Sequence, residues 1–143
     1  MPYYFAYGSN LSFAQMAQRC PGAKSLGKAR LIGWRYLIYE RGYANIVPDA
    51  AGETWGGVWE VTADHLRALD VFEGVAKGLY HRVECGVELE GDAHVRCVVY
   101  IDSNPNGGIP GVPKADYQSR ILAGAHDFSL PQDYIAILES LAK

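Results

Sequence analysis

The sequence predicts a single α+β domain built on a curled sheet or barrel. Short apolar runs rich in β-branched and aromatic residues are separated by Gly and Pro, and the few helix-like segments do not alternate strictly with these runs. A chain of 143 residues has the length of one domain, which is enough to bury a core without disulfides or metal ions. We therefore expect residues 1–143 to form one domain.

Six segments have the composition of β-strands. Each contains the β-branched or aromatic residues that favour a pleated, half-buried backbone, and turn-forming residues separate them. The expected strands are Pro2 to Tyr7, Ala29 to Ile32, Arg35 to Glu40, Trp55 to Val61, Tyr80 to Leu89 and Val95 to Asp102.

Four segments have helical character. The second follows Thr62, a suitable N-cap, and ends at Gly74, which favours a left-handed stop. The expected helices are Leu11 to Arg19, Ala63 to Phe72, Asp116 to Ala125 and Pro131 to Leu141. Between them, the Gly/Pro-rich segment from Ser103 to Lys114 is an expected loop of the kind that often forms a lid.

Charge and hydropathy exclude two classes of partner. The formal net charge is -3, and Lys and Arg are scattered, so the sequence lacks the basic cluster that binds a phosphate backbone. The first apolar run is too short for a signal sequence or a membrane-spanning helix. We expect a cytoplasmic protein that binds neither nucleic acid nor membrane.

Cysteine and histidine spacing predicts no metal site and no disulfide scaffold. The three cysteines lack a CxxC motif, and the four histidines lack the short spacings of metal ligands. Cys85 and Cys97 flank a turn, and we expect them to face each other across a hairpin, where core packing is favoured over a redox role. A Walker loop and a dinucleotide fingerprint are also absent.

Glu73 is the strongest candidate for acid–base chemistry. Helical spacing projects it between Leu66 and Leu69, so its carboxylate points inward at the C-terminal end of a helix. Burial and the helix dipole both favour the neutral acid and raise the pKa toward the range of a useful base. An ion pair with Arg67 or Arg82, or a frayed helix end, is the structural alternative.

The segment "YFAYGSN", from Tyr4 to Asn10, ends in a polar hook. Gly8 permits a sharp turn that exposes consecutive N–H groups, which suit an oxyanion or a carboxylate. Helix capping by Ser9, Asn10 or Ser12 is the simpler alternative. Neither Ser9 nor a cysteine has a recognisable base partner, so a covalent triad is not expected.

Tyrosine is unusually frequent, with ten residues in the chain. Four of them lie at the ends of predicted elements, where a ring packs while its hydroxyl reaches a polar pocket: Tyr4, Tyr80, Tyr100 and Tyr117. Packing alone is the alternative for each of them.

Four stretches together resemble the gamma-glutamylcyclotransferase family. They are "YFAYGSNL" at Tyr4 to Leu11, "WGGVWEV" at Trp55 to Val61, "LDVFEGVAKGLYHR" at Leu69 to Arg82 and "DYQSRILAGAHDFSLPQDYIAIL" at Asp116 to Leu138. They occur in the family's order and span nearly the whole chain. The segment before Tyr117, "GGIPGVPKAD", departs from the shorter Pro/Ser segment that the family has before this helix. The resemblance therefore does not extend to the rim of the pocket.

The resemblance implies a small mixed β-barrel flanked by helices, and a reaction without a cofactor that releases 5-oxoproline from a gamma-glutamyl amide. By motif, Glu73 takes the position of the acid/base. The implied substrate-binding residues are Tyr4, Phe5, Ala6, Tyr7, Gly8, Ser9, Asn10, Tyr80, Tyr100 and Tyr117.

Several alternatives stay open at this point. Related enzymes act on gamma-glutamyl amino acids, gamma-glutamyl amines, glutathione or gamma-glutamyl-protected intermediates, and the sequence does not select among them. A non-catalytic domain that binds a small carboxylate or a protein partner is the alternative to an enzyme. Hydrolysis would give free glutamate in place of 5-oxoproline, and the family resemblance leaves a homodimer open.

Overall fold

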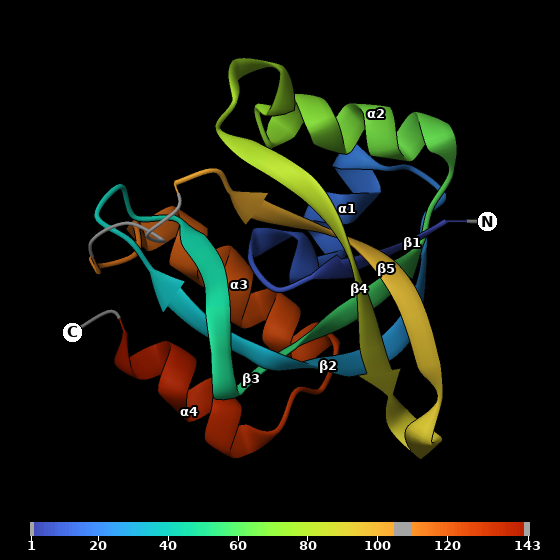
Figure 1. Ribbon diagram of the computed structural model, residues 1–143. Helices are drawn as coiled ribbons and strands as arrows, with labels where there is room; N and C mark the ends of the chain where they lie inside the picture. The colour runs from blue at the N-terminus through green and yellow to red at the C-terminus, as the bar shows by residue number, and fades with distance from the viewer. Residues whose placement is uncertain (1, 105–109, 142–143) are drawn as a thin grey trace.

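A closed barrel forms the centre of the protein. The computed structural model describes residues 2–104 and 110–141. Within these residues the strands follow the order β1-β3-β2-β4-β5 around the barrel (Figure 1). Neighbouring strands pair antiparallel, except that β1 runs parallel to β5 and closes the barrel at Tyr4 and Val98. The strands are β1 (Tyr3–Ala6), β2 (Lys24–Ile38), β3 (Ala44–Glu60), β4 (Tyr80–Leu89) and β5 (His94–Asp102).

Helices cover the barrel at both ends. α2 crosses the top of the barrel in Figure 1, and α4 lies at the bottom. The α-helices are α1 (Phe13–Arg19), α2 (Ala63–Phe72), α3 (Ala115–Asp127) and α4 (Gln132–Ser140), and the short 3-10 turns are η1 (Ser9–Leu11), η2 (Val75–Lys77) and η3 (Glu90–Asp92). None of the helices in the described part of the chain has the length and apolar character that a bilayer crossing requires. The closed barrel and the helices around it confirm the predicted α+β barrel.

The two longest strands differ most from the sequence prediction. The segments predicted as Ala29 to Ile32 and Arg35 to Glu40 are one strand, β2, whose ladder with β3 continues past an irregularity between Ile32 and Trp34. Gly33 lies at this irregularity with φ 91°, a conformation that suits glycine. β3 begins at Ala44 rather than Trp55, because pairing with β2 extends the ladder through residues that resemble a loop in sequence.

The helix signals were more reliable than the strand signals. α2 spans the predicted residues, and Thr62 caps it by accepting a hydrogen bond from the His65 N–H, while the His65 ring accepts one from the Thr62 N–H. The first helix starts at Phe13 rather than Leu11, because Ser12 is its N-cap and the preceding residues form the separate turn η1. α3 is slightly longer than predicted, and α4 slightly shorter.

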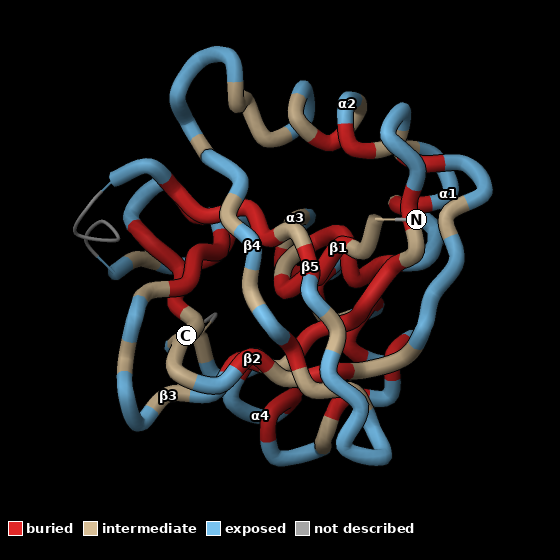
Figure 2. Tube along the Cα trace, turned by 45° about the vertical axis from the view of Figure 1, so that its right-hand side comes forward, coloured by how far each residue is buried: buried red, intermediate tan, exposed pale blue. Residues whose placement is uncertain are grey.

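The core consists of two clusters of buried side chains. One contains residues from all five strands, including Phe5, Ile46 and Val99, and the other joins strand residues to the inner faces of the helices, including Leu69 and Ile121. Figure 2 shows these buried segments inside the fold, with the exposed segments outside them.

The two hairpin cysteines lie opposite each other, as predicted. Cys85 pairs with Cys97 in the ladder between β4 and β5, and neither forms a disulfide. Part of the predicted loop from Ser103 to Lys114 lies outside the described residues, so its role as a lid stays a prediction. On its far side, Pro110 forms a β-bridge with Tyr39.

Candidate active site

One cavity of about 370 Å³ collects most of the residues that the sequence singled out. Its walls come from the hook after β1, α1, the turn between β2 and β3, the end of α2, the beginning of β4, β5 and α3. The lining residues are Tyr4, Tyr7, Gly8, Ser9, Asn10, Arg19, Tyr39, Arg41, Tyr43, Ala44, Phe72, Glu73, Leu79, Tyr80, Tyr100, Tyr117 and Arg120.

Glu73 enters this cavity from the C-terminal end of α2. It is the C-cap of the helix, and its N–H donates to the Leu69 carbonyl at 2.8 Å. The next residue, Gly74, has φ 65°, which turns the chain away from the helix and toward β4. Helix termination therefore places a carboxylate at the cavity wall instead of on the outer face.

Burial raises the pKa of Glu73 from 4.5 to about 7, and the positive charge of Arg19 opposes part of this rise. Among the described residues, no Lys, Arg or His forms an ion pair with it. A carboxylate with a pKa near neutrality can both accept and release a proton at neutral pH.

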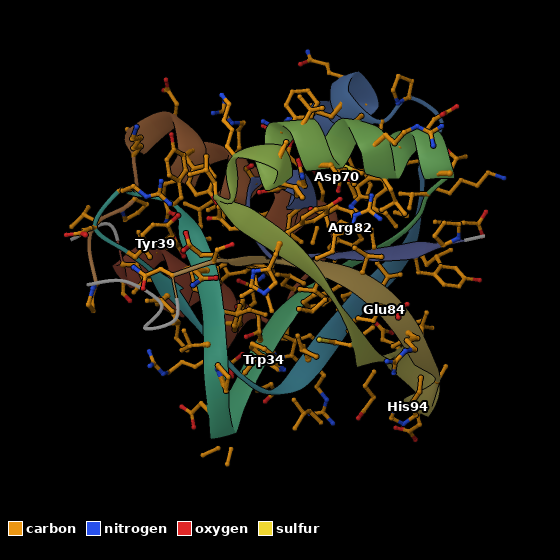
Figure 3. The ribbon with its side chains drawn as sticks, turned by 45° about the horizontal axis from the view of Figure 1, so that its top comes forward. Trp34, Tyr39, Asp70, Arg82, Glu84 and His94 are labelled. Atoms are coloured by element: carbon orange, nitrogen blue, oxygen red, sulfur yellow. The ribbon has the colours of Figure 1, made fainter. Side chains whose placement is uncertain are left out.

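The ion pairs considered for Glu73 from the sequence are wrong. Arg82 binds Asp70 through two hydrogen bonds, from Nε at 2.7 Å and from Nη2 at 2.5 Å, and Arg67 pairs with Asp64. Asp70 lies almost one turn before Glu73 and faces β4. It therefore pairs with Arg82 in place of Glu73. Figure 3 shows Asp70 on α2 and Arg82 beneath it on β4.

The ion pair of Asp70 with Arg82 also fixes a cavity residue. The Tyr100 hydroxyl donates to Asp70 Oδ1 at 2.7 Å, and the Tyr100 ring packs edge-on against Tyr4 with centroids 5.7 Å apart. The sequence singled out Tyr100 but not the carboxylate that orients it.

Side chains of α1 hold the polar hook in place. Gln15 Nε2 donates to Ser9 Oγ at 2.7 Å and to Asn10 Oδ1 at 2.8 Å, and Arg19 Nη1 donates to the same Asn10 oxygen at 3.1 Å. Asn10 Nδ2 in turn donates to the Tyr4 hydroxyl at 3.0 Å. The polar side chains of the hook thus stabilise its shape.

The hook leaves backbone donors available. Ser12, not Ser9 or Asn10, caps α1 by accepting from the Gln15 N–H. Ser9 and Asn10 begin η1, where N–H groups lack partners within the turn, and within the described part of the chain neither N–H has an acceptor. This geometry is consistent with the predicted anion-binding hook.

Gly8 and Tyr117 approach each other closely. A Cβ added at Gly8 would lie 2.9 Å from the Tyr117 hydroxyl, so a larger residue would displace the ring. The same hydroxyl accepts a hydrogen bond from the Ala44 N–H at 3.1 Å. Tyr117 is therefore locked between the hook and the start of β3.

Two tyrosine hydroxyls have a proton to offer a ligand. Those of Tyr4 and Tyr117 act as acceptors in the contacts above, and neither donates to any acceptor among residues 2–104 and 110–141. Burial raises the pKa of Tyr4, Tyr7 and Tyr117, and the negative charge of Glu73 adds to each rise. All three hydroxyls stay protonated at neutral pH, close to the carboxylate.

A hydrogen-bonded cluster of three polar side chains, Tyr39, Arg41 and Tyr80, lies at the start of β3. The Tyr80 hydroxyl donates to the Ala44 carbonyl at 2.8 Å and lies 3.1 Å from the Tyr39 hydroxyl. Arg41 Nη2 donates to the Tyr39 hydroxyl at 2.7 Å and to Asp102 Oδ2 at 3.0 Å. Figure 3 shows Tyr39 at the end of β2, away from Asp70.

Positive charge predominates in the cavity. Glu73 is the one carboxylate among the described lining residues, whereas Arg19, Arg41 and Arg120 contribute three guanidinium groups. Such a lining attracts an anionic ligand. The sequence analysis missed these arginines, because each comes from a different element and none belongs to a local motif.

Comparison with known proteins agrees with this geometry. Residues 53–138 match the sequence model of the AIG2-like family. The gamma-glutamylcyclotransferase of Homo sapiens is 30% identical over 148 residues, which cover 96% of this chain and 77% of the relative. That of Bos taurus is 31% identical with the same coverage.

The chain belongs to the gamma-glutamylcyclotransferase family. A solved structure described as a gamma-glutamyl cyclotransferase superimposes with a TM-score of 0.89 and 29% identity, covering 98% of this chain and 87% of that one. The resemblance found in the sequence is confirmed, as are the β-barrel fold and enzymatic activity of the gamma-glutamylcyclotransferase type.

The cavity contains most of the site residues that the family resemblance implied. Glu73, Tyr80, Tyr100 and Tyr117 line it, as do five residues of the first segment: Tyr4, Tyr7, Gly8, Ser9 and Asn10. Phe5 and Ala6 do not line it. They are fully buried in the two core clusters, because the strand continues through both residues before the hook begins. Their assignment to substrate binding stays a prediction.

The described residues contain no group of three or more His, Cys, Asp or Glu side chains placed to hold a metal ion. That the gamma-glutamylcyclotransferase reaction needs neither metal nor cofactor here stays a prediction.

Proposed function

We propose that this enzyme cyclises the glutamyl group of a gamma-glutamyl amide, releasing 5-oxoproline and an amine, with Glu73 as general acid and base. The observation that carries the proposal is the carboxylate of Glu73, which lines the cavity with a pKa of about 7 and has no ion-pair partner among the described residues.

In the proposed reaction, the α-amine of the substrate attacks its own γ-carbonyl carbon. A carbon–nitrogen bond forms to close the ring, and the amide bond to the leaving nitrogen breaks. The α-ammonium loses two protons, and the leaving nitrogen gains two. Glu73 accepts protons from the first nitrogen and delivers them to the second, which a group with a pKa near neutrality can do in both directions.

The remaining cavity residues hold the substrate in a ring-closing conformation. Intramolecular attack from a fixed geometry lowers the barrier by several kcal/mol, on the order of 7 when alignment is good. The free protons of the Tyr4 and Tyr117 hydroxyls suit the glutamyl α-carboxylate. The N–H groups of Gly8, Ser9 and Asn10 suit the same carboxylate or the oxyanion of the tetrahedral intermediate.

A product assay tests the proposed function. Wild-type protein is incubated with a panel of gamma-glutamyl amino acids, gamma-glutamyl amines and glutathione, and 5-oxoproline and free glutamate are quantified together by mass spectrometry. We expect 5-oxoproline from at least one panel member. Free glutamate as the product would show hydrolysis instead, and no turnover of any member would contradict the proposal.

Arg19 offers a test of the electrostatics around Glu73. Its positive charge lowers the Glu73 pKa, so Arg19→Gln should raise that pKa further and move the acid limb of the kcat/KM profile to higher pH. Arg19→Lys keeps the charge and serves as the matched control, with a limb closer to that of the wild type. An acid limb that stays in place in Arg19→Gln would show that Arg19 does not act on the titrating group.

A further inference from the structure

Arg120 differs from the other two arginines of the cavity because its side chain has no hydrogen bond or ion pair within residues 2–104 and 110–141. Arg19 binds Asn10 and lies over the Phe72 ring at 4.3 Å, and Arg41 binds Asp102. Arg120 lines the same cavity and is exposed. Its guanidinium is therefore available to a ligand.

The position of Arg120 places it near the outer part of a bound substrate. It follows Tyr117 by three residues on α3, so both side chains share one helix face. Tyr117 is fixed at the hook beside Gly8, close to Glu73, where the ring-closing atoms must lie. Arg120 is more exposed than Tyr117, which places it on the solvent side of the cavity wall, where a leaving group would emerge.

The cavity wall also has apolar surface. Phe72 and Leu79 line the cavity, although 53% and 42% of their surfaces are exposed. A free guanidinium and exposed apolar side chains in the wall of one cavity match a leaving group with a carboxylate and an apolar side chain. A simple alkylamine would use only the apolar part and would leave Arg120 without a counter-charge.

We propose that Arg120 determines leaving-group specificity by binding the carboxylate of a departing amino acid, with its apolar side chain against Phe72 and Leu79. This inference rests on the proposed cyclotransferase reaction. A gamma-glutamyl amino acid with an uncharged side chain has two carboxylates and one ammonium, so its net charge also suits the positive lining of the cavity.

The test compares two substrates that differ only in this carboxylate: gamma-glutamyl-leucine and the gamma-glutamyl amide of 3-methylbutylamine. The quantity measured is the ratio of their kcat/KM values, from 5-oxoproline release at low ionic strength. We expect the wild type to favour the leucine compound, and Arg120→Gln to lower the ratio by about tenfold, as loss of a charged hydrogen bond at a solvated rim predicts. Arg120→Lys should retain most of the preference.

Arg96→Gln is the matched control, because Arg96 is exposed on β5 and does not line the cavity; its ratio should equal that of the wild type. A ratio that Arg120→Gln leaves unchanged, while wild type releases 5-oxoproline from both compounds, would overturn this inference alone. If the wild type releases 5-oxoproline from other members of the panel but from neither of these two compounds, this inference alone is overturned. Release of 5-oxoproline from no compound at all would instead overturn the proposed function.

Discussion

Glu73→Gln should lower kcat by at least about a hundredfold, the usual contribution of a positioned acid–base group. The amide has nearly the shape of the carboxylate and fits the same space at the end of α2, but it can neither accept nor deliver the protons that ring closure moves. Because the α-helical hydrogen bonds of Glu73 involve its backbone, the variant should keep the fold. The measurement is single-turnover release of 5-oxoproline, with circular dichroism to confirm folding.

Glu84→Gln is the matched control for this substitution. Figure 3 shows Glu84 on the hairpin of β4 and β5. Its side chain is 66% exposed and approaches Arg96, and it does not line the cavity. Its kcat should equal that of the wild type. Wild-type activity in Glu73→Gln would remove Glu73 from the proposed mechanism.

Glu73→Gln should also make the protein more stable than the wild type at neutral and alkaline pH. The folded-state pKa of Glu73, about 7, lies above its ordinary value of 4.5, so the folded state binds this proton more tightly than the unfolded state does. Stability from this group is complete below pH 4.5 and is lost as the pH rises to about 7. The full loss is on the order of 3 kcal/mol at most, from 1.36 kcal/mol per pKa unit.

Urea unfolding of the wild type and Glu73→Gln at several pH values measures this effect. The difference in the free energy of unfolding should grow in favour of the variant between pH 4.5 and about 7 and then level off. A constant difference across this range would mean that the Glu73 pKa is not raised by folding.

The fold was predictable wherever local signals agreed with tertiary pairing. The boundaries of α2 followed from its cap at Thr62 and its stop at Gly74, and β4 was predicted from the aromatic and β-branched residues that it contains. The first part of β3 contains Pro48 and Gly52, which favour loops, and only the ladder with β2 makes it a strand. Long-range pairing of this kind leaves no local pattern in the sequence.

The candidate site was predictable only for the residues that local sequence signals place. Helical spacing identified Glu73, because its inward position and the helix end are both local properties. The place of Arg120 in the cavity wall and the polar contacts of Arg41 with Asp102 depend on how distant elements meet. The sequence left open an ion pair of Arg82 with Glu73, because only the packing of β4 against α2 shows that Arg82 binds Asp70 instead.

The proposed mechanism requires that Glu73 titrate near neutrality inside the cavity, and carboxyl-carbon NMR measures this titration. Protein labelled with ¹³C at the glutamate side-chain carboxyls is titrated, and the signal that is missing in Glu73→Gln is assigned to Glu73. We expect a midpoint at about pH 7. A midpoint close to 4.5 would show an ordinary carboxylate and would contradict the proposed mechanism.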